Sequence, residues 1–214
     1  MRPLRSIGRR AGTNVIRGYA EGRVRHQVVP ALHSAQMWAH PLIAGAFDDR
    51  LRADLLAAAE NLPAMVDELE SMPVGTAHGD ACTRNLLVRP GSEALVLIDF
   101  TFWGEGPLGA DLSQLLVGEV QVGDRAASSL PDLEEVCVPA YVAGLHSEGC
   151  HVDEAVIRRS HALWMLLFSG LSAFPFEHLD SPPTPYLHRI TSERAQTARF
   201  ILDLVQRSPA GSDA

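Results

Sequence analysis

Two short apolar runs separated by a turn constrain this fold more than any other stretch of the chain. Leu86–Val88 and Ala94–Ile98 are rich in leucine, valine and isoleucine, and Arg89–Ser92 between them has the composition of a turn. If the two runs pair as antiparallel strands, Asn85 before the first and Asp99 after the second lie at the same open end. Two oxygen ligands then face one point, and a hard cation such as Mg²⁺ prefers oxygen ligands.

A third polar side chain precedes this predicted hairpin. Asp80 lies five positions before Asn85 on the preceding loop, so we expect it near the same open end. A carboxylate in that position is a candidate for orienting or deprotonating the hydroxyl group of a substrate.

The order and spacing of several short motifs resemble the catalytic core of the aminoglycoside phosphotransferase family. That family is a branch of the protein-kinase-like fold, which also includes choline and homoserine kinases, and the local sequence HGDAC is similar to the aminoglycoside 3′-phosphotransferases. The matching motifs, in chain order, are His78–Asp80, Asn85, Ile98–Phe100, Gly106–Pro107 and Asp111–Leu112.

The resemblance implies a role for each polar residue of the site. Asp80 is expected to act as the catalytic base, with His78 supporting the catalytic loop. Asn85 and Asp99 are expected to hold Mg²⁺ and, through it, the co-substrate ATP. Asp111, at the start of the next helix, is expected to brace the loop.

Two other interpretations of these residues remain open. The carboxylates of Asp80 and Asp111 could be ordinary loop and helix-capping groups, with Asn85 a turn residue. A metal-dependent hydrolase using His78, Asp80 and Asp99 is a weaker alternative, because no second histidine falls at ligand spacing.

Composition limits the partners and the location. The chain has 214 residues, is 46% hydrophobic and has a formal net charge of −8, which predicts a soluble globule without a nucleic-acid groove and favours a cationic or neutral small ligand. No apolar stretch reaches membrane-spanning length without interruption, so no membrane partner is expected. The three cysteines, Cys82, Cys137 and Cys150, form no CxxC pair, which favours a reducing cytoplasm.

The pattern predicts an α+β, mostly helical domain between two irregular ends. Residues 1–25 carry seven arginines and no clear apolar period, which predicts a basic, poorly ordered arm, and residues 208–214 are expected to be a disordered tail. Residues 26–207 are expected to form the kinase-like C-lobe, in which the short β-hairpin carries the catalytic loop. Helices are expected at residues 48–62, 64–69, 111–117, 131–147, 153–170 and 187–206.

Some further side chains admit both a functional and a structural interpretation. His26, His33 and His40 recur every seven residues, but Pro30 interrupts them and no carboxylate accompanies them, so packing or surface roles are favoured over a metal site. Trp103 can stack on a substrate or cap the core. By resemblance, Glu177 and Asp180 can hold an amine-bearing substrate, although a solvated loop is the favoured interpretation.

The part of the chain before the site lacks the features of a kinase N-lobe. All 18 basic residues are arginine, and the 77 residues before His78 contain neither a series of strands nor a glycine-rich phosphate loop. The resemblance therefore covers a C-lobe with the N-lobe absent. Three explanations are open: a truncated form of a longer enzyme, a chain that meets an N-lobe on another polypeptide, and a non-catalytic binding or scaffold module.

Overall fold

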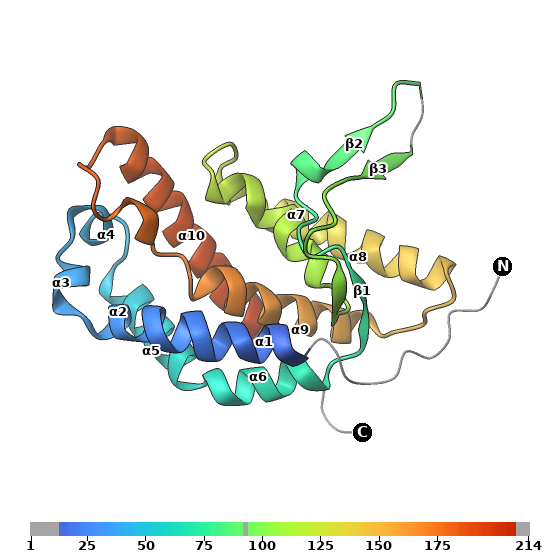
Figure 1. Ribbon diagram of the computed structural model, residues 1–214, viewed down its shortest axis with the longest axis horizontal. Coiled ribbons are helices and arrows are strands. Elements are labelled where there is room, and N and C mark those ends of the chain that lie inside the picture. The colour runs from blue at the N-terminus through green and yellow to red at the C-terminus, as the bar shows by residue number, and fades with distance from the viewer. Residues whose placement is uncertain (1–12, 92–93, 209–214) are drawn as a thin grey trace.

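The computed structural model describes residues 13–91 and 94–208 of the chain. Within these residues the fold is mostly helical and contains two small sheets of two strands each (Figure 1). The predicted α+β, mostly helical class agrees with this architecture, whereas the assignment to a kinase-like C-lobe stays a prediction at this stage. No helix in the described part of the chain is long and apolar enough to cross a membrane.

The chain begins with a continuous helical run made of α1 (Thr13–Tyr19), the π-helical segment η1 (Ala20–Val28) and α2 (Val29–His33). Its apolar side chains recur every fourth residue and face the core. These buried side chains are Ile16, Ala20, Val24, Val28 and Leu32. This continuous apolar face packs the run against the remaining helices.

The prediction of a poorly ordered arm over residues 1–25 is therefore wrong for residues 13–25, and residues 1–12 lie outside the described residues. The many arginines obscured this apolar pattern in the sequence, but two of them, Arg17 and Arg25, are paired with carboxylates within the fold. Arg17 contacts Asp67 and Glu70 at 3.0 and 2.6 Å, and Arg25 contacts the carboxylate one turn earlier in its own helix.

The next helices complete the N-terminal half. They are the short helices α3 (Ala35–Trp38) and α4 (Pro41–Ala44), followed by α5 (Asp49–Glu60) and α6 (Leu62–Ser71). Asp48 caps α5, since its side chain accepts a hydrogen bond from the Leu51 amide at 2.8 Å. Helices expected at 48–62 and 64–69 are thus confirmed.

The three evenly spaced histidines do not form a metal site. His26 and His33 are exposed, and His40 bonds through Nε2 to the carbonyl of Leu179 at 3.1 Å. Among the described residues, no group of three or more histidine, cysteine, aspartate or glutamate side chains could hold a metal ion.

Two antiparallel strand pairs enclose the site. β2 (Leu86–Val88) pairs with β3 (Leu95–Leu97), with Leu86 opposite Leu97, which confirms the predicted hairpin. β1 (Val74–Ala77) pairs with β4 (Gly104–Pro107), and neither of these strands was predicted from the sequence. Glycine and proline suppress the local strand signal there, and it is the long-range pairing between residues some 30 positions apart that makes the second sheet.

The C-terminal half consists of longer helices. These are α7 (Ala110–Gln121), α8 (Leu130–Ser147), α9 (Glu154–Met165) and α10 (Pro185–Arg207), with the shorter segments η2 (Thr83–Asn85), η3 (Ala127–Ser129), η4 (Leu166–Gly170) and η5 (Phe176–His178). The four helices expected in this half are confirmed, and Pro139 does not divide α8.

A single large core joins the two halves. Buried side chains from α9 and η4, including Met165, Leu166 and Leu167, pack with those of α10, as expected for this apolar segment. Arg159 ties α9 to α6 through two bonds to Glu68, at 2.6 and 2.7 Å, and it also donates to the carbonyl of Ser208 at 2.8 Å. Residues 209–214 of the expected tail lie outside the described residues.

The β2–β3 hairpin projects away from this helical body (Figure 1). Its apolar side chains are largely exposed, as are those of the loop that follows it. The site described below lies at the base of this hairpin.

Candidate functional site

The site is made by two loops that run between the two sheets. The first loop leaves β1 after Ala77 and enters η2 and β2, and the second leaves β3 after Leu97 and enters β4. Because β1 pairs with β4 and β2 with β3, both loops are fixed at both ends and are held next to each other.

His78 joins the two loops. Its ring is buried, and its Nε2 lies 2.9 Å from the carbonyl oxygen of Ile98 on the second loop. The Asp80 amide lies 3.3 Å from Nδ1. One neutral tautomer satisfies both contacts, with Nε2 donating and Nδ1 accepting. The ring also lies 5.0 Å from that of Phe100.

Asp111 holds the first loop from α7. Its two carboxylate oxygens accept hydrogen bonds from the amides of His78 and Gly79, both at 2.9 Å. Gly109, in the left-handed conformation, occupies the capping position of α7, so Asp111 lies in the first turn instead of serving as the helix cap. Such charge-assisted bonds to backbone amides fix the loop conformation, as expected of a bracing carboxylate.

Gly79 is required by the geometry of the loop. Its φ is +81°, and a Cβ at this position would overlap the carbonyl of Phe102 on the second loop. Only glycine combines this backbone conformation with such a close approach.

Asp80 and Asn85 lie in direct contact. The Asn85 side-chain nitrogen donates to the Asp80 carbonyl at 2.8 Å and to Asp80 Oδ2 at 3.1 Å. This leaves Oδ1 of Asp80 to accept a proton or a hydrogen bond, and it leaves the Asn85 side-chain oxygen as a ligand. Asp80 is half-buried and lines a cavity of about 190 Å³ together with Cys82, Thr83 and Gln114.

Asp99 has an unusual backbone conformation. Its φ is +60°, and it is the one non-glycine residue with positive φ among residues 13–91 and 94–208. Aspartate tolerates this region better than most residues, and strain of this kind concentrates at functional sites.

The hydrogen bonds of Asp99 keep its carboxylate ionised. Thr101 donates to Oδ1 from its hydroxyl at 2.6 Å and from its amide at 3.4 Å. These two bonds lower the pKa of Asp99.

The site residues proposed from the sequence thus fall into two groups. Hydrogen bonds link His78, Asp80, Asn85 and Asp111 into one network, whereas Asp99 bonds locally to Thr101. The donor set suits a cation that takes few protein ligands, because an ionised carboxylate and an amide oxygen are the ligands Mg²⁺ uses when phosphate and water supply the others. The metal and catalytic roles of these residues stay predictions.

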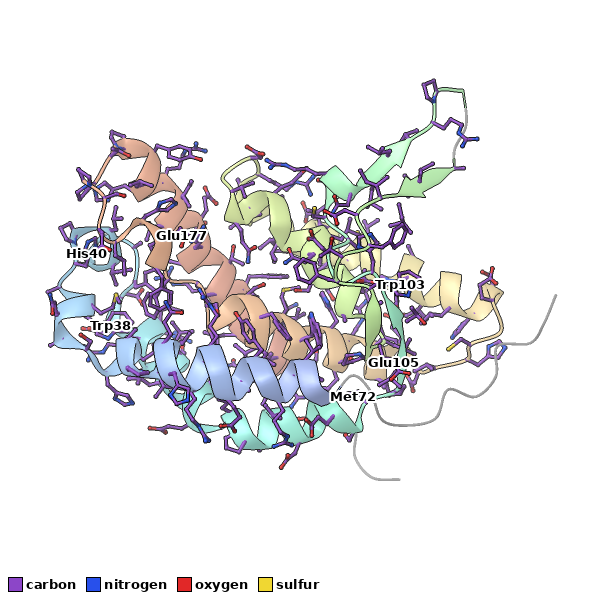
Figure 2. All side chains as sticks on the ribbon, viewed as in Figure 1. Trp38, His40, Met72, Trp103, Glu105 and Glu177 are labelled. Carbon is purple, nitrogen blue, oxygen red and sulfur yellow. The ribbon has the colours of Figure 1, made fainter. Side chains whose placement is uncertain are left out.

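Two contributors to this geometry were not predicted from the sequence. Thr101 could have been found, because an aspartate followed two residues later by threonine is a known local bonding pattern. The carbonyl of Phe102, which requires glycine at position 79, had no sequence signal. Trp103 lies at the base of the hairpin, exposed and with its ring 5.3 Å from that of Phe100, so it does not cap the core (Figure 2).

A helical domain that holds two short loops between two strand pairs, with an aspartate, an asparagine and a bracing carboxylate on them, is typical of a phosphotransferase. The comparison with models of known families supports this class. Residues 18–144 match the phosphotransferase enzyme family (APH), and since this is more than half of the chain, the chain belongs to that family. No curated protein and no solved structure gives a significant match.

Proposed function

We propose that this protein transfers the γ-phosphoryl group of ATP, in the presence of Mg²⁺, to a hydroxyl group of a small molecule. The observation that carries the proposal is the hydrogen-bonded network of His78, Asp80, Asn85 and Asp111 in a chain that belongs to the phosphotransferase enzyme family. Phosphoryl transfer depends mainly on positioning and electrostatic stabilisation, and a rigid loop network provides the positioning.

Each residue contributes one step of positioning. Asp80 accepts the hydrogen bond of the acceptor hydroxyl through Oδ1 and takes its proton as transfer proceeds, while Asn85 fixes the orientation of its other oxygen. Asp99 and the side-chain oxygen of Asn85 would be the protein ligands for Mg²⁺. When bound, the ion neutralises charge on the β- and γ-phosphates.

In a kinase-like enzyme the N-lobe forms the second wall of the nucleotide cleft. The described residues hold two sheets of two strands each, and neither is the five-stranded sheet of a kinase N-lobe. We propose that another polypeptide supplies this wall in trans. In support, the surface around the site is apolar and exposed: Phe100, Phe102 and Trp103 are 50%, 68% and 56% exposed, and an apolar surface of this kind is typical of an interaction site.

We further propose that the protein works in a reducing compartment such as the cytoplasm. In support, Cys82, Cys137 and Cys150 are all free thiols.

Ligand-induced stabilisation tests the nucleotide site. Mg²⁺ with ATP at a hundredfold excess over Kd should stabilise the protein by about 2.7 kcal/mol, and Asp99→Asn should remove most of this effect. Asp203→Asn is the control, because it removes an exposed carboxylate from α10, away from both loops. If no stabilisation occurs with the wild-type protein, the non-catalytic module is the better description.

Turnover tests the chemistry separately. With a panel of alcohols and labelled ATP, Asp80→Asn should lower transfer by about 10²- to 10⁴-fold while leaving nucleotide binding intact, since a general base contributes roughly this factor. Equal transfer by the wild type and Asp80→Asn would refute the assigned role of this carboxylate.

A further inference from the structure

A larger cavity adjoins the one that contains Asp80. It has a volume of about 520 Å³, within the usual range for small-molecule sites, and Tyr19, Arg23, Phe174 and Arg194 are among the residues that line it. Gln121, at the end of α7, lines both cavities. An acceptor whose hydroxyl group reaches Asp80 can therefore extend its remaining part into the larger cavity.

One side of this larger cavity is aromatic and fixed in place. The ring of Tyr19 lies 4.4 Å from that of Phe168, and the Tyr19 hydroxyl bonds to Ser172 at 2.8 Å. Phe174, which also lines the cavity, is almost fully buried. A preformed aromatic wall favours a flat or apolar body over a highly hydrated one.

Among the described residues, Glu177 is the one carboxylate that lines the cavity, and it is already ion-paired. Glu177 lies beside α10 (Figure 2), and its Oε1 is 2.6 Å from Nη2 of Arg194, which also donates to the Gln121 carbonyl at 3.1 Å. An amine-bearing ligand would have to displace this arginine from Glu177. The ion pair with Arg194 thus argues against the amine-binding role that the family resemblance allows for Glu177, a role that the sequence already disfavoured relative to a solvated loop.

Arg23 is the remaining charge of this lining. Its guanidinium lies 5.7 Å from the ring centre of Phe176, and no carboxylate pairs with it within the described part of the chain. Most of the other described arginines are paired with carboxylates, for example Arg17 and Arg25 in the same helical run. The larger cavity therefore has one uncompensated positive charge.

The smaller cavity has a negative charge, that of Asp80, where the acceptor hydroxyl is proposed to bind. Asp80 makes no ion pair with any described residue, whereas Arg84 and Glu119 beside it are each paired, with Asp124 and Arg125 respectively. The two adjoining cavities thus differ in charge: the smaller one has a carboxylate without an ion-pair partner among the described residues, and the larger one has a guanidinium without one.

We propose that the acceptor is an alcohol that carries an anionic group on an apolar, aromatic-type body. Its hydroxyl group binds at Asp80, its body lies against Tyr19 and Phe168, and its carboxylate or phosphate binds Arg23. This inference rests on the proposed function, since it assigns the substrate class of the same site. Arginine binds carboxylate and phosphate through paired, charge-assisted hydrogen bonds, which makes it suited to this recognition.

Three matched aromatic alcohols test the charge preference directly. The probes are 4-(hydroxymethyl)benzoate, its neutral methyl ester and the cationic 4-(aminomethyl)benzyl alcohol, each with its hydroxyl group and its variable group on opposite sides of the ring. Their binding is measured by calorimetry without ATP at low salt. A fourth probe, 4-(hydroxymethyl)phenyl phosphate, distinguishes a phosphate from a carboxylate as the better anionic group. We expect the anionic probes to bind about tenfold more tightly than the neutral ester, as for one hydrogen-bonded charge contact, and the cationic probe to bind most weakly.

Variants of two arginines in one helix separate a specific contact from a general charge effect. Arg23→Gln should abolish the difference between the anionic and neutral probes. Arg25→Gln, which removes the same charge two residues later from a side chain paired with Glu21, should preserve it. Arg23→Glu should reverse the preference in favour of 4-(aminomethyl)benzyl alcohol.

The outcomes distinguish this inference from the proposed function. It is overturned if 4-(aminomethyl)benzyl alcohol binds best, if Arg23→Gln and Arg25→Gln behave alike, or if no probe binds at millimolar concentration. If the anionic probes bind through Arg23 but are never phosphorylated in the presence of Mg²⁺ and ATP, the ligand assignment stands and the proposed function fails. If other alcohols are phosphorylated in an Asp80-dependent reaction and Arg23→Gln has no effect, the proposed function stands and the ligand assignment fails.

Discussion

A fully buried histidine should make the fold sensitive to mild acid. His161 on α9 has no exposed surface, and neither ring nitrogen has a hydrogen-bond partner among the described residues. Burial penalises the charged form and lowers the pKa of His161 to about 4, while the nearby backbone of Gly109 acts in the opposite direction and Arg158 adds to the decrease. The imidazole is therefore neutral in the folded protein at pH 7.

The sign and size of the effect follow from the two pKa values. The ordinary value is 6.5, so the unfolded chain takes up a proton first as the pH falls, and the folded state loses stability between pH 6.5 and about 4. The full difference amounts to about 3 kcal/mol, of which about 2 kcal/mol should already be lost on going from pH 7.5 to pH 5.

His161→Leu should remove this acid sensitivity. Leucine has a similar volume, and it eliminates two buried nitrogens without partners, so its free energy of unfolding at pH 7.5 should equal or exceed that of the wild type by about 1 kcal/mol. Urea unfolding at pH 7.5, 6.5 and 5, followed by tryptophan fluorescence, measures both quantities. His33→Leu, which removes an exposed imidazole, is the control and should keep the pH dependence of the wild type.

The reasoning is refuted if the wild type and His161→Leu lose the same stability between pH 7.5 and pH 5. It is also refuted if His161→Leu is strongly destabilised at pH 7.5, because that would reveal a hydrogen bond made by the ring. His161 packs against Gly109 at the start of α7, where a Cβ on the glycine would lie 3.3 Å from that of the histidine. Protonation should therefore disturb the helix that carries Asp111 first.

Three further substitutions separate site geometry from stability. Asp111→Ala removes the acceptor of two loop amides and should lower phosphoryl transfer by at least tenfold, measured as kcat, with far-UV circular dichroism unchanged. Gly79→Ala should abolish transfer and cost about 1–3 kcal/mol in urea unfolding, because its backbone is left-handed and faces the carbonyl of Phe102; wild-type behaviour would contradict this. Arg159→Met should cost about 3 kcal/mol by leaving Glu68 unpaired, with no effect on ligand binding per folded molecule.

Much of the fold could be predicted from the sequence where the signal was local. The β2–β3 hairpin followed from two apolar runs and a turn, and α5, α9 and α10 followed from apolar periodicity with identifiable caps at Asp48 and Asp153. The β1–β4 pair could not be predicted, because its stability comes from pairing between Val74–Ala77 and a glycine-rich segment far along the chain.

In the candidate site, too, local motifs could be predicted from the sequence but tertiary geometry could not. Motif order singled out His78, Asp80, Asn85 and Asp111, and the structure places them in one hydrogen-bonded network. The left-handed backbone of Asp99 is a tertiary feature, since it depends on how the loop leaves β3 and enters β4. No spacing rule in the sequence specifies that conformation.

The first helical run, part of which was expected to be a poorly ordered arm, contributes side chains both to the core and to the larger cavity. Ala20 and Val24 lie on the stripe that faces the core, whereas Tyr19 and Arg23, each one residue earlier, line the larger cavity. Two adjacent faces of this helical run thus have different roles, one in the core and one in the cavity. They are distinct because neighbouring residues of a helix point in directions about 100° apart. Substitutions at positions 20 and 24 should reduce stability, whereas substitutions at position 23 should change ligand preference in a protein that is still folded. An arginine-rich segment can therefore be structural and specific at once, provided that its apolar positions share one face.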